Sequence, residues 1–474
     1  MATSTQVTER VIASGALRPS PGAHAADVTA SGTTAAPTGS SAALPHPRRG
    51  QPAAAPAAPA APAAHDIPQL TGLRFVAALW VLVHHVSFVP GEVYARWLAP
   101  LAPIAAAGPL GVDLFFVLSG LVLARSYLER FGGAPGPRQV ASFLWARFAR
   151  VWPLYAVVVC GFGAWCLARA TFGGDDVVTW QTPQPDLGPL GWLRQLTMTQ
   201  LWTSPDIEGI SFVLPAWSVS AEWLAYLAFP ALAVAAWRMR GWPRPVLAAL
   251  AVLAASPVGA LVLLQAVGAA SGAWPWVARI GGGFTAGVLT WLVVWRIPRT
   301  AAVETWAHRI VLVVLAELLL VIYWAASAPA SATLGAEARL YLAVPLFPVL
   351  LAALTLSRRG PAAWLSGARM QHGGRISYAL YLVHFPMLEV TVVAMTRFDA
   401  LAPNSSAAAL LVPHVVVASI LVAHLAYRFV EAPAQQWLRA KDPSRHRAGA
   451  RRAGASRRLA GRRGGSHVAR PVPA

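Results

Sequence analysis

An arginine and two histidines interrupt an otherwise apolar stretch, "LRFVAALWVLVHH", which covers residues 73–85. Arg74 and His85 are eleven positions apart, close to three turns of an α-helix, so both would project from one helix face about 16 Å apart along its axis. His84 would point about 100° away from that face. Ionisable groups inside an apolar span are candidates for function. We therefore expect His85 to be a general base; the alternative for either histidine is a polar side chain that neighbouring helices satisfy.

A carboxylate on the next apolar segment is placed to meet His85. Asp113 lies near the start of "GPLGVDLFFVLSGLVLARSY", at about the depth that His85 reaches at the end of the first segment. A carboxylate beside an imidazole fixes its tautomer and raises its basicity. We therefore predict, from depth alone, that Asp113 orients His85 in catalysis. Ser119 and Gly120 in the same segment are expected to serve close helix packing.

Two later apolar segments also carry polar groups. Glu222 lies some seven residues into "PAWSVSAEWLAYLAFP", about 10 Å deep, where a carboxylate requires a partner or a proton. Tyr226, one turn further on, shares its face. In "ISYALYLVHFP", His384 falls near the midplane of the span, one turn from Tyr381. We expect Glu222 to take part in catalysis, and His384, Tyr226 and Tyr381 to contact a substrate or to support the catalytic side chains.

Four arginines are expected to gather at the inner mouth of the helices. Arg147 and Arg150 stand in "RFARVWP", just before the third apolar segment, and Arg74 and Arg125 lie at the inner ends of the first two. Guanidinium groups bind phosphate through two parallel hydrogen bonds, so such a cluster suits a phosphorylated cosubstrate. The general excess of arginine in cytoplasmic loops explains any one of the four equally well.

The composition is that of a polytopic membrane protein. Of 474 residues, 56% are apolar and 12% charged, against about 25% charged in soluble domains, and the mean hydropathy is +0.52. We predict an all-α bundle of about ten transmembrane helices, since ten apolar runs are long enough to cross about 30 Å of hydrocarbon. These runs lie near residues 69–89, 108–128, 151–171, 215–237, 246–267, 277–295, 309–328, 339–357, 375–397 and 407–429.

Charge predicts the orientation and the ends of the bundle. Arginines concentrate in alternate connections and in both tails, so the positive-inside rule places both termini in the cytoplasm. Residues 1–65, rich in Ala and Pro, are predicted to be a disordered cytoplasmic leader, 66–437 the transmembrane domain and 438–474 a disordered Arg-rich cytoplasmic tail. From Arg439 onward there are eleven Lys or Arg and one acid. Such a tail favours contact with membrane lipid over nucleic acid, which we do not expect as a partner.

Six motifs together resemble the acyltransferase 3 family of integral membrane O-acyltransferases. They occur in the family's order over roughly residues 68–435, and each is weak by itself. They read "GLRFVAALWVLVHH", "GVDLFFVLSG", "RFARVWP", "PAWSVSAEWLAYLAFP", "ISYALYLVHFP" and "YRFVEAP".

The resemblance implies that an acyl group, commonly acetyl, passes from cytoplasmic acyl-CoA to a hydroxyl of a surface glycan or related sugar-containing acceptor. The family's essential arginine and histidine match Arg74 and His85, which favours His85 over His84. By analogy, His85 would deprotonate the acceptor hydroxyl or carry the acyl group transiently. Its inner arginine motif matches Arg147 and Arg150, and its acidic position after "WS" matches Glu222. Acyl-CoA would be a cosubstrate, with no permanently bound cofactor and no metal.

The resemblance also bears on localisation and specificity. It implies a multi-pass protein of the bacterial cytoplasmic membrane, compatible with partner proteins of a polysaccharide pathway. Relatives often have a second acid and aromatics after the glutamate of "WS", where this chain has Trp223, Leu224 and Ala225; that departure puts the acceptor in doubt.

Two other classes of protein fit some of the same features. A transporter or flippase of a sugar or lipid-linked sugar also has many spans with buried charges, but it favours paired, repeat-related broken helices. No matching halves are visible in the sequence, and the arginines cluster at one face only. A structural scaffold has no use for buried His85, Glu222 and His384. The roles of His84, of Glu317 and of Glu431, which lies near Arg428, stay open at this point.

Overall fold

The computed structural model describes residues 67–91, 96, 99–173, 184–256, 275–329 and 335–442. Within this part of the chain all regular secondary structure is helical, and nine helices are long and apolar enough to cross a membrane. The prediction of an all-α polytopic bundle is therefore confirmed. The leader 1–65 and most of the tail, from residue 443 on, lie outside the described residues.

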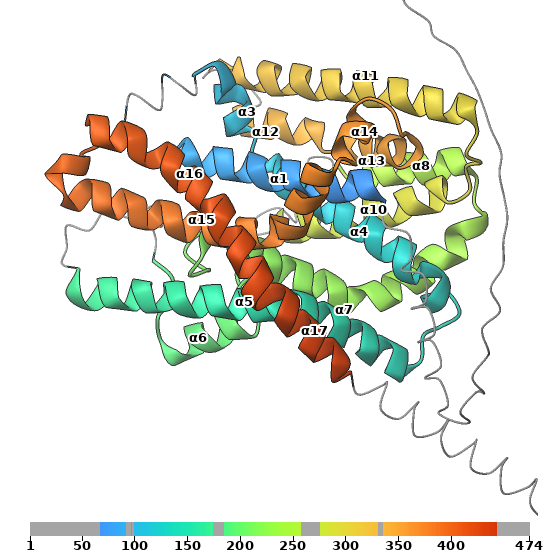
Figure 1. The fold of residues 1–474 in the computed structure, drawn as a ribbon. Helices are drawn as coiled ribbons and strands as arrows, with labels where there is room; N and C mark the ends of the chain where they lie inside the picture. The colour runs from blue at the N-terminus through green and yellow to red at the C-terminus, as the bar shows by residue number, and fades with distance from the viewer. Residues whose placement is uncertain are drawn as a thin grey trace, which may run out of the picture. The chain divides into compact units, whose positions relative to one another are not determined.

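The helices run along the chain as shown in Figure 1. Their bounds are α1 Pro68–Val86, η1 Ala99–Leu101, α3 Ala102–Ala106, α4 Leu110–Phe131, α5 Pro137–Phe172, α6 Pro189–Leu196, η2 Leu214–Ala216, α7 Trp217–Arg238, η3 Met239–Gly241, α8 Arg244–Ala254, α10 Pro275–Val294, α11 Ala301–Ala326, α12 Ala336–Leu340, η4 Tyr341–Ala343, α13 Leu346–Leu356, α14 Pro361–Leu365, α15 Ala368–Arg397, η5 Asp399–Leu401, α16 Ser406–Ala426, the π-helix η6 Tyr427–Glu431 and α17 Ala432–Ala440.

Three predicted spans differ in detail from these helices. The fifth, 246–267, is represented by α8, and its second half lies outside the described residues. The eighth, 339–357, is broken into α12, η4 and α13, with Pro345 at the N-cap of α13. The third extends over 36 residues as α5, because the helix already begins at Pro137, ahead of the apolar run that starts at residue 151. These differences leave the order of the spans unchanged, with α8 as a shorter apolar helix beside the nine long ones.

Helix α1 is a central element of the bundle, in contact with α15, α4, α3, α13 and α14. Helices α4 and α10 approach most closely through glycines. A Cβ at Gly120 would lie 2.0 Å from the Phe284 carbonyl oxygen, and one at Gly287 would lie 2.0 Å from that of Val117. Small residues allow helix backbones to meet where no hydrophobic effect drives them together. The expectation of close packing at Gly120 is confirmed, and this contact fixes α10 beside the helix that carries Asp113.

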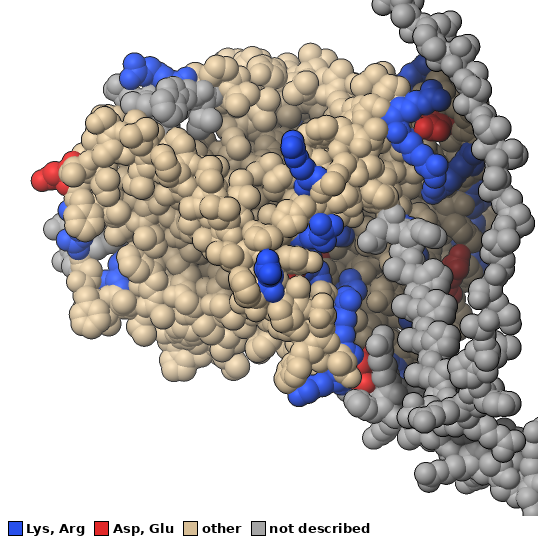
Figure 2. All heavy atoms as spheres, in the orientation of Figure 1, with Lys and Arg blue, Asp and Glu red and all other residues tan. Residues whose placement is uncertain are grey.

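Charged side chains are unevenly distributed along the bundle. Figure 2 shows Lys and Arg gathered toward the end where α14 lies and α17 ends, while uncharged side chains cover most of the remaining face. Helices α3 and α6 lie in the opposite half of the bundle, toward the end where α15 ends and α16 begins (Figure 1). This separation follows the sequence pattern, and we refer below to the two as the basic end and the α3–α6 end.

Candidate active site

His85 lies in the last turn of α1 and is 8% exposed. Its Nδ1 is 2.9 Å from the carbonyl oxygen of Val81, one turn earlier in the helix. The same Nδ1 is 3.2 Å from Nε2 of His384, on α15. Both contacts use one ring nitrogen, and among the described residues Nε2 of His85 has no hydrogen-bond partner. That nitrogen is the one that can meet a substrate.

His384 is completely buried at the midpoint of α15. Its Nδ1 is 2.9 Å from the Leu380 carbonyl oxygen, in the same one-turn geometry that His85 has with Val81. The two imidazole rings are 5.0 Å apart between centroids. The sequence indicated His384 as a supporting residue but did not indicate that its partner is His85.

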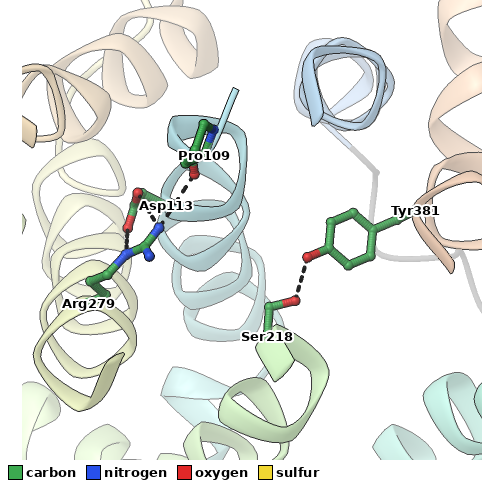
Figure 3. A network of polar contacts seen from close by, with 5 residues as sticks. All are labelled: Pro109, Asp113, Ser218, Arg279 and Tyr381. Carbon is green, nitrogen blue, oxygen red and sulfur yellow. Dashed lines mark hydrogen bonds and ion pairs between the residues drawn. The ribbon is translucent and has the colours of Figure 1, made fainter. Parts of the chain in front are cut away.

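Asp113 does not make the predicted contact with His85; its charge is paired with Arg279 instead. Arg279 Nε donates to Oδ1 at 3.0 Å and Nη2 to Oδ2 at 2.9 Å, as Figure 3 shows. The guanidinium also lies over the rings of Trp217 and Tyr341, 5.1 Å from each centroid. Similar depth in two helices does not decide which faces meet, and Asp113 faces α10.

Tyr381 lies between this ion pair and the histidines. Its hydroxyl is 2.7 Å from Ser218 Oγ, in the first turn of α7 (Figure 3). It also donates to the Pro215 carbonyl oxygen of η2 at 3.0 Å. Its ring centroid is 6.0 Å from that of His384. Tyr381 therefore ties α15 to α7 beside the imidazole pair, which agrees with a supporting position.

Glu222, half-buried on α7, has two hydroxyl donors. Tyr226 donates to Oε1 at 2.5 Å across one helical turn, and Ser119 of α4 donates to the same oxygen. Tyr226 shares a helix face with Glu222, as predicted, and its hydroxyl makes a hydrogen bond to the carboxylate. Ser119, expected only to pack, also holds the carboxylate. Glu222 thus has the partners that a carboxylate at this depth requires.

Three of the four predicted arginines meet in one cluster. Arg150 lies within electrostatic range of Arg74, Arg147 and Tyr226, and its guanidinium lies over the Tyr378 ring, 5.5 Å from the centroid. We call Arg74, Arg147 and Arg150 the arginine cluster. Like charges repel, so an anionic partner is required to hold three guanidinium groups together.

Glu431 supplies one such anion. It is 1% exposed and forms an ion pair with Arg150, not with the adjacent Arg428. The π-helix η6 ends at Glu431, and this wider turn carries the carboxylate toward α5. Single π-turns are frequent at functional sites. The contact joins the last membrane helix to the arginine cluster.

Arg147 and Arg125 occupy different surroundings. Arg147 lies over the rings of Tyr127 and Phe143, 5.7 and 6.0 Å from their centroids, and its buried Nε has no hydrogen-bond partner among the described residues. Arg125 lies over the Trp291 ring of α10, 5.8 Å from the centroid. Arg147 therefore has a donor group available to a ligand, and Arg125 is oriented toward α10.

The His84 ring lies edge-on to His85, 5.3 Å between centroids, but its own hydrogen bond is made to α3. Its Nδ1 is 2.9 Å from the Ala105 carbonyl oxygen of α3, and the ring packs against Gly108, where a Cβ would lie 2.2 Å from that of His84. The alternative of a satisfied polar side chain describes His84 well.

Three buried ionic residues were missed by the sequence reasoning. Arg279 stands alone in the apolar run 277–295, and its charge inside a span was the available signal. Arg169 and Glu389 form a second buried ion pair at 2.7 Å between α5 and α15. Each has the same signal, a charge within a membrane span.

The described residues hold no group of three or more His, Cys, Asp or Glu side chains placed to bind a metal ion. The groups that could act in catalysis or binding are the imidazole pair His85–His384, the hydrogen-bonded carboxylate of Glu222 and the arginine cluster. Tyr378 lies within electrostatic range of both Arg150 and Glu222, so the cluster and the carboxylate are neighbours.

The fold and the site define a polytopic helical membrane protein with a buried pair of imidazoles and a cluster of arginines. The family model of the acyltransferase 3 family, described as an acyltransferase domain, matches residues 67–428. The chain belongs to this family, as the six motifs had predicted.

Two curated relatives align with part of the chain. Acyltransferase MdmB of Streptomyces mycarofaciens is 32% identical over 166 residues, which are 35% of this chain and 38% of the relative. Protein 2 in the picA locus of Rhizobium radiobacter is 33% identical over 163 residues, 32% of this chain and 75% of that protein. The alignment thus spans less than half the length of MdmB. No solved structure matches the chain.

Proposed function

We propose that this protein is a membrane O-acyltransferase that moves an acyl group, acetyl in the simplest case, from cytoplasmic acyl-CoA to a hydroxyl acceptor. The observation that carries the proposal is His85, held by its Nδ1 with Nε2 unpaired, in the same bundle as the arginine cluster. An imidazole with a free basic nitrogen suits proton removal from a hydroxyl. Membership of the acyltransferase 3 family and the likeness to an acyltransferase support this choice.

The reaction needs a base and a later proton donor, and one imidazole supplies both. Nε2 of His85 accepts the hydroxyl proton as the acceptor oxygen attacks the thioester carbonyl carbon. The tetrahedral intermediate then expels the CoA sulfur as its bond to carbon breaks, and the proton passes from Nε2 to the thiolate. An ester and free CoA thiol result, with atoms and charge balanced.

The donor is proposed to lie with its phosphates against the arginine cluster. CoA carries a pyrophosphate and a ribose phosphate, both of which guanidinium groups bind through paired hydrogen bonds. Arg147, with a buried unpaired Nε, and Arg150, which lies between Arg74 and Glu431, are the groups positioned for this. This assignment keeps all four predicted arginines as donor-binding residues: Arg74, Arg147 and Arg150 in the cluster, and Arg125 at its edge, over Trp291.

The acceptor is proposed to be a hydroxyl of a glycan or other exported sugar-containing molecule that reaches His85 from the α3–α6 end. The histidine is in the last turn of α1, adjacent to α3, so that end of the bundle is the nearer one. A location in the bacterial cytoplasmic membrane, with the basic end inside, completes the proposal.

The experiment is release of CoA from acetyl-CoA by the purified protein in detergent, without added acceptor. We expect slow hydrolytic turnover that disappears in His85→Ala and Arg74→Ala. The matched control is His84→Ala, which should retain turnover because His84 is bonded to the α3 backbone. If the wild type neither releases nor binds CoA, the acyl-CoA donor is wrong, and transport of a sugar becomes the next assay.

A further inference from the structure

The hydrogen positions of the two histidines follow from their backbone contacts. An unprotonated ring nitrogen 2.9 Å from a carbonyl oxygen would bring two lone pairs together. Nδ1 therefore carries the proton in His85, facing Val81, and in His384, facing Leu380. Nε2 of His384 is then unprotonated, and its lone pair accepts a hydrogen bond from Nδ1–H of His85 at 3.2 Å. The same assignment makes Nε2 of His85 the basic nitrogen.

We propose that His384 is the positioning residue of the catalytic base, in the place that a carboxylate usually holds beside an imidazole. It directs Nε2 of His85 toward the substrate and stabilises the positive charge that His85 acquires when it takes the hydroxyl proton. This inference rests on the proposed function, and it assigns to His384 the role that the sequence had indicated for Asp113.

A neutral partner suits this position in the bundle. Burying a carboxylate is costly unless it is paired, and Asp113 already has its charge matched by Arg279. His384 is 0% exposed and carries no charge to desolvate in the resting state. It still supplies an acceptor at the moment when the charge on His85 appears. The chain of hydrogen bonds ends at the Leu380 carbonyl oxygen, whose dipole adds to the stabilisation.

The test compares two substitutions at His384 in the full-length protein in detergent. His384→Gln can place an amide oxygen near the former Nε2 and keep an acceptor, whereas His384→Phe fills the space without one. We expect His384→Phe to lower kcat for acetyl-CoA hydrolysis by about a hundredfold and His384→Gln by less than about tenfold. The KM for acetyl-CoA should change by less than about twofold in both, because the contacts of His384 are with His85, Leu380 and Tyr381.

The chain provides a matched control on the same helix. His372 of α15 faces His424 of α16 with the same 5.0 Å between ring centroids. His372→Phe removes a histidine from such a pair without touching His85, and it should leave kcat and KM as in the wild type. Thermal unfolding of each variant shows which substitutions preserve the fold.

A second readout needs no donor. In ¹⁵N spectra of histidine-labelled protein, with signals assigned by their loss in His85→Ala and His384→Gln, both rings should carry the proton on Nδ1. A proton on Nε2 of His85 overturns the proposal even if hydrolysis is never observed. A folded His384→Phe with wild-type kcat also overturns it, as does an effect confined to KM. A folded His384→Gln that is as inactive as His85→Ala would make His384 the base instead. Should His384→Phe fail to fold, His384→Gln and the spectra decide.

Discussion

Arg279 binds both carboxylate oxygens of Asp113 and thereby joins α10 to α4 inside the bundle. The distances are 3.0 Å from Nε to Oδ1 and 2.9 Å from Nη2 to Oδ2, and the two side chains are 11% and 2% exposed. Each carboxylate oxygen of Asp113 accepts a hydrogen bond from the guanidinium, so the charge of Asp113 is matched by Arg279. It explains why the acid is tolerated at that depth without any contact to His85.

Breaking this pair should cost stability. Asp113→Asn leaves Arg279 buried without a counter-charge, a change that typically destabilises a protein by about 3–5 kcal/mol. Replacing both partners, as Asp113→Leu with Arg279→Met, should restore much of the loss. Thermal unfolding in detergent micelles measures both. A variant Asp113→Asn that melts like the wild type but loses kcat more than tenfold would show instead that Asp113 acts in the chemistry.

Arginine geometry should matter at the donor site. Arg147→Lys keeps the charge but loses the planar fork, so we expect the KM for acetyl-CoA to rise about tenfold with kcat little changed. The control is Arg138→Lys, exposed at the start of α5, which should have no effect. The measurement is the kinetics of CoA release by each variant. A lower kcat at unchanged KM would instead place Arg147 at the reacting atoms.

The carboxylate of Glu222 should be needed for turnover. Glu222→Gln preserves the shape of the side chain but removes the charge that accepts from Ser119 and Tyr226, and we expect kcat to fall at least tenfold. Tyr226→Phe removes only one donor and should have a smaller effect. If both variants turn over at the wild-type rate, Glu222 has a packing role alone.

The glycine contact between α4 and α10 should be intolerant of a methyl group. Gly120→Ala would set a Cβ 2.0 Å from a backbone oxygen, and overpacking of this kind costs about 1–3 kcal/mol. Gly161→Ala is the matched control, because nothing lies within 4 Å of its added Cβ on α5. We expect Gly120→Ala to lower the midpoint of thermal unfolding and Gly161→Ala to leave it unchanged. Equal midpoints would mean that the two helices can move apart at no energetic cost.

The orientation can be tested by cysteine labelling. Starting from protein in which Cys160 and Cys166 are replaced by Ala, we would place one cysteine at exposed Asn404 or at exposed Arg138. The positive-inside pattern predicts that an impermeant maleimide applied to intact bacterial cells labels position 404 only. Labelling of position 138 alone would reverse the orientation and move the arginine cluster to the outside.

The sequence by itself determined everything that depends on neighbours along the helix. Helical period placed Arg74 and His85 on one face and brought Tyr226 to Glu222 across one turn, as the structure confirms for the latter. Length and hydropathy determined the order of the spans and most of their bounds, and the ordered motifs determined the family. Each of these features depends on residues that are close together in the chain, so a short stretch of sequence is enough to recognise it.

Only the tertiary structure decided which helix faces meet. His85 and His384 are 299 positions apart, and Asp113 and Arg279 are 166 apart. The sequence placed His85 and Asp113 at similar depth, but rotation of α4 toward α10, permitted by Gly120 and Gly287, turned the acid to a different partner. Packing between helices depends on small steric fits summed over whole surfaces, and no single residue or spacing along the chain records that sum.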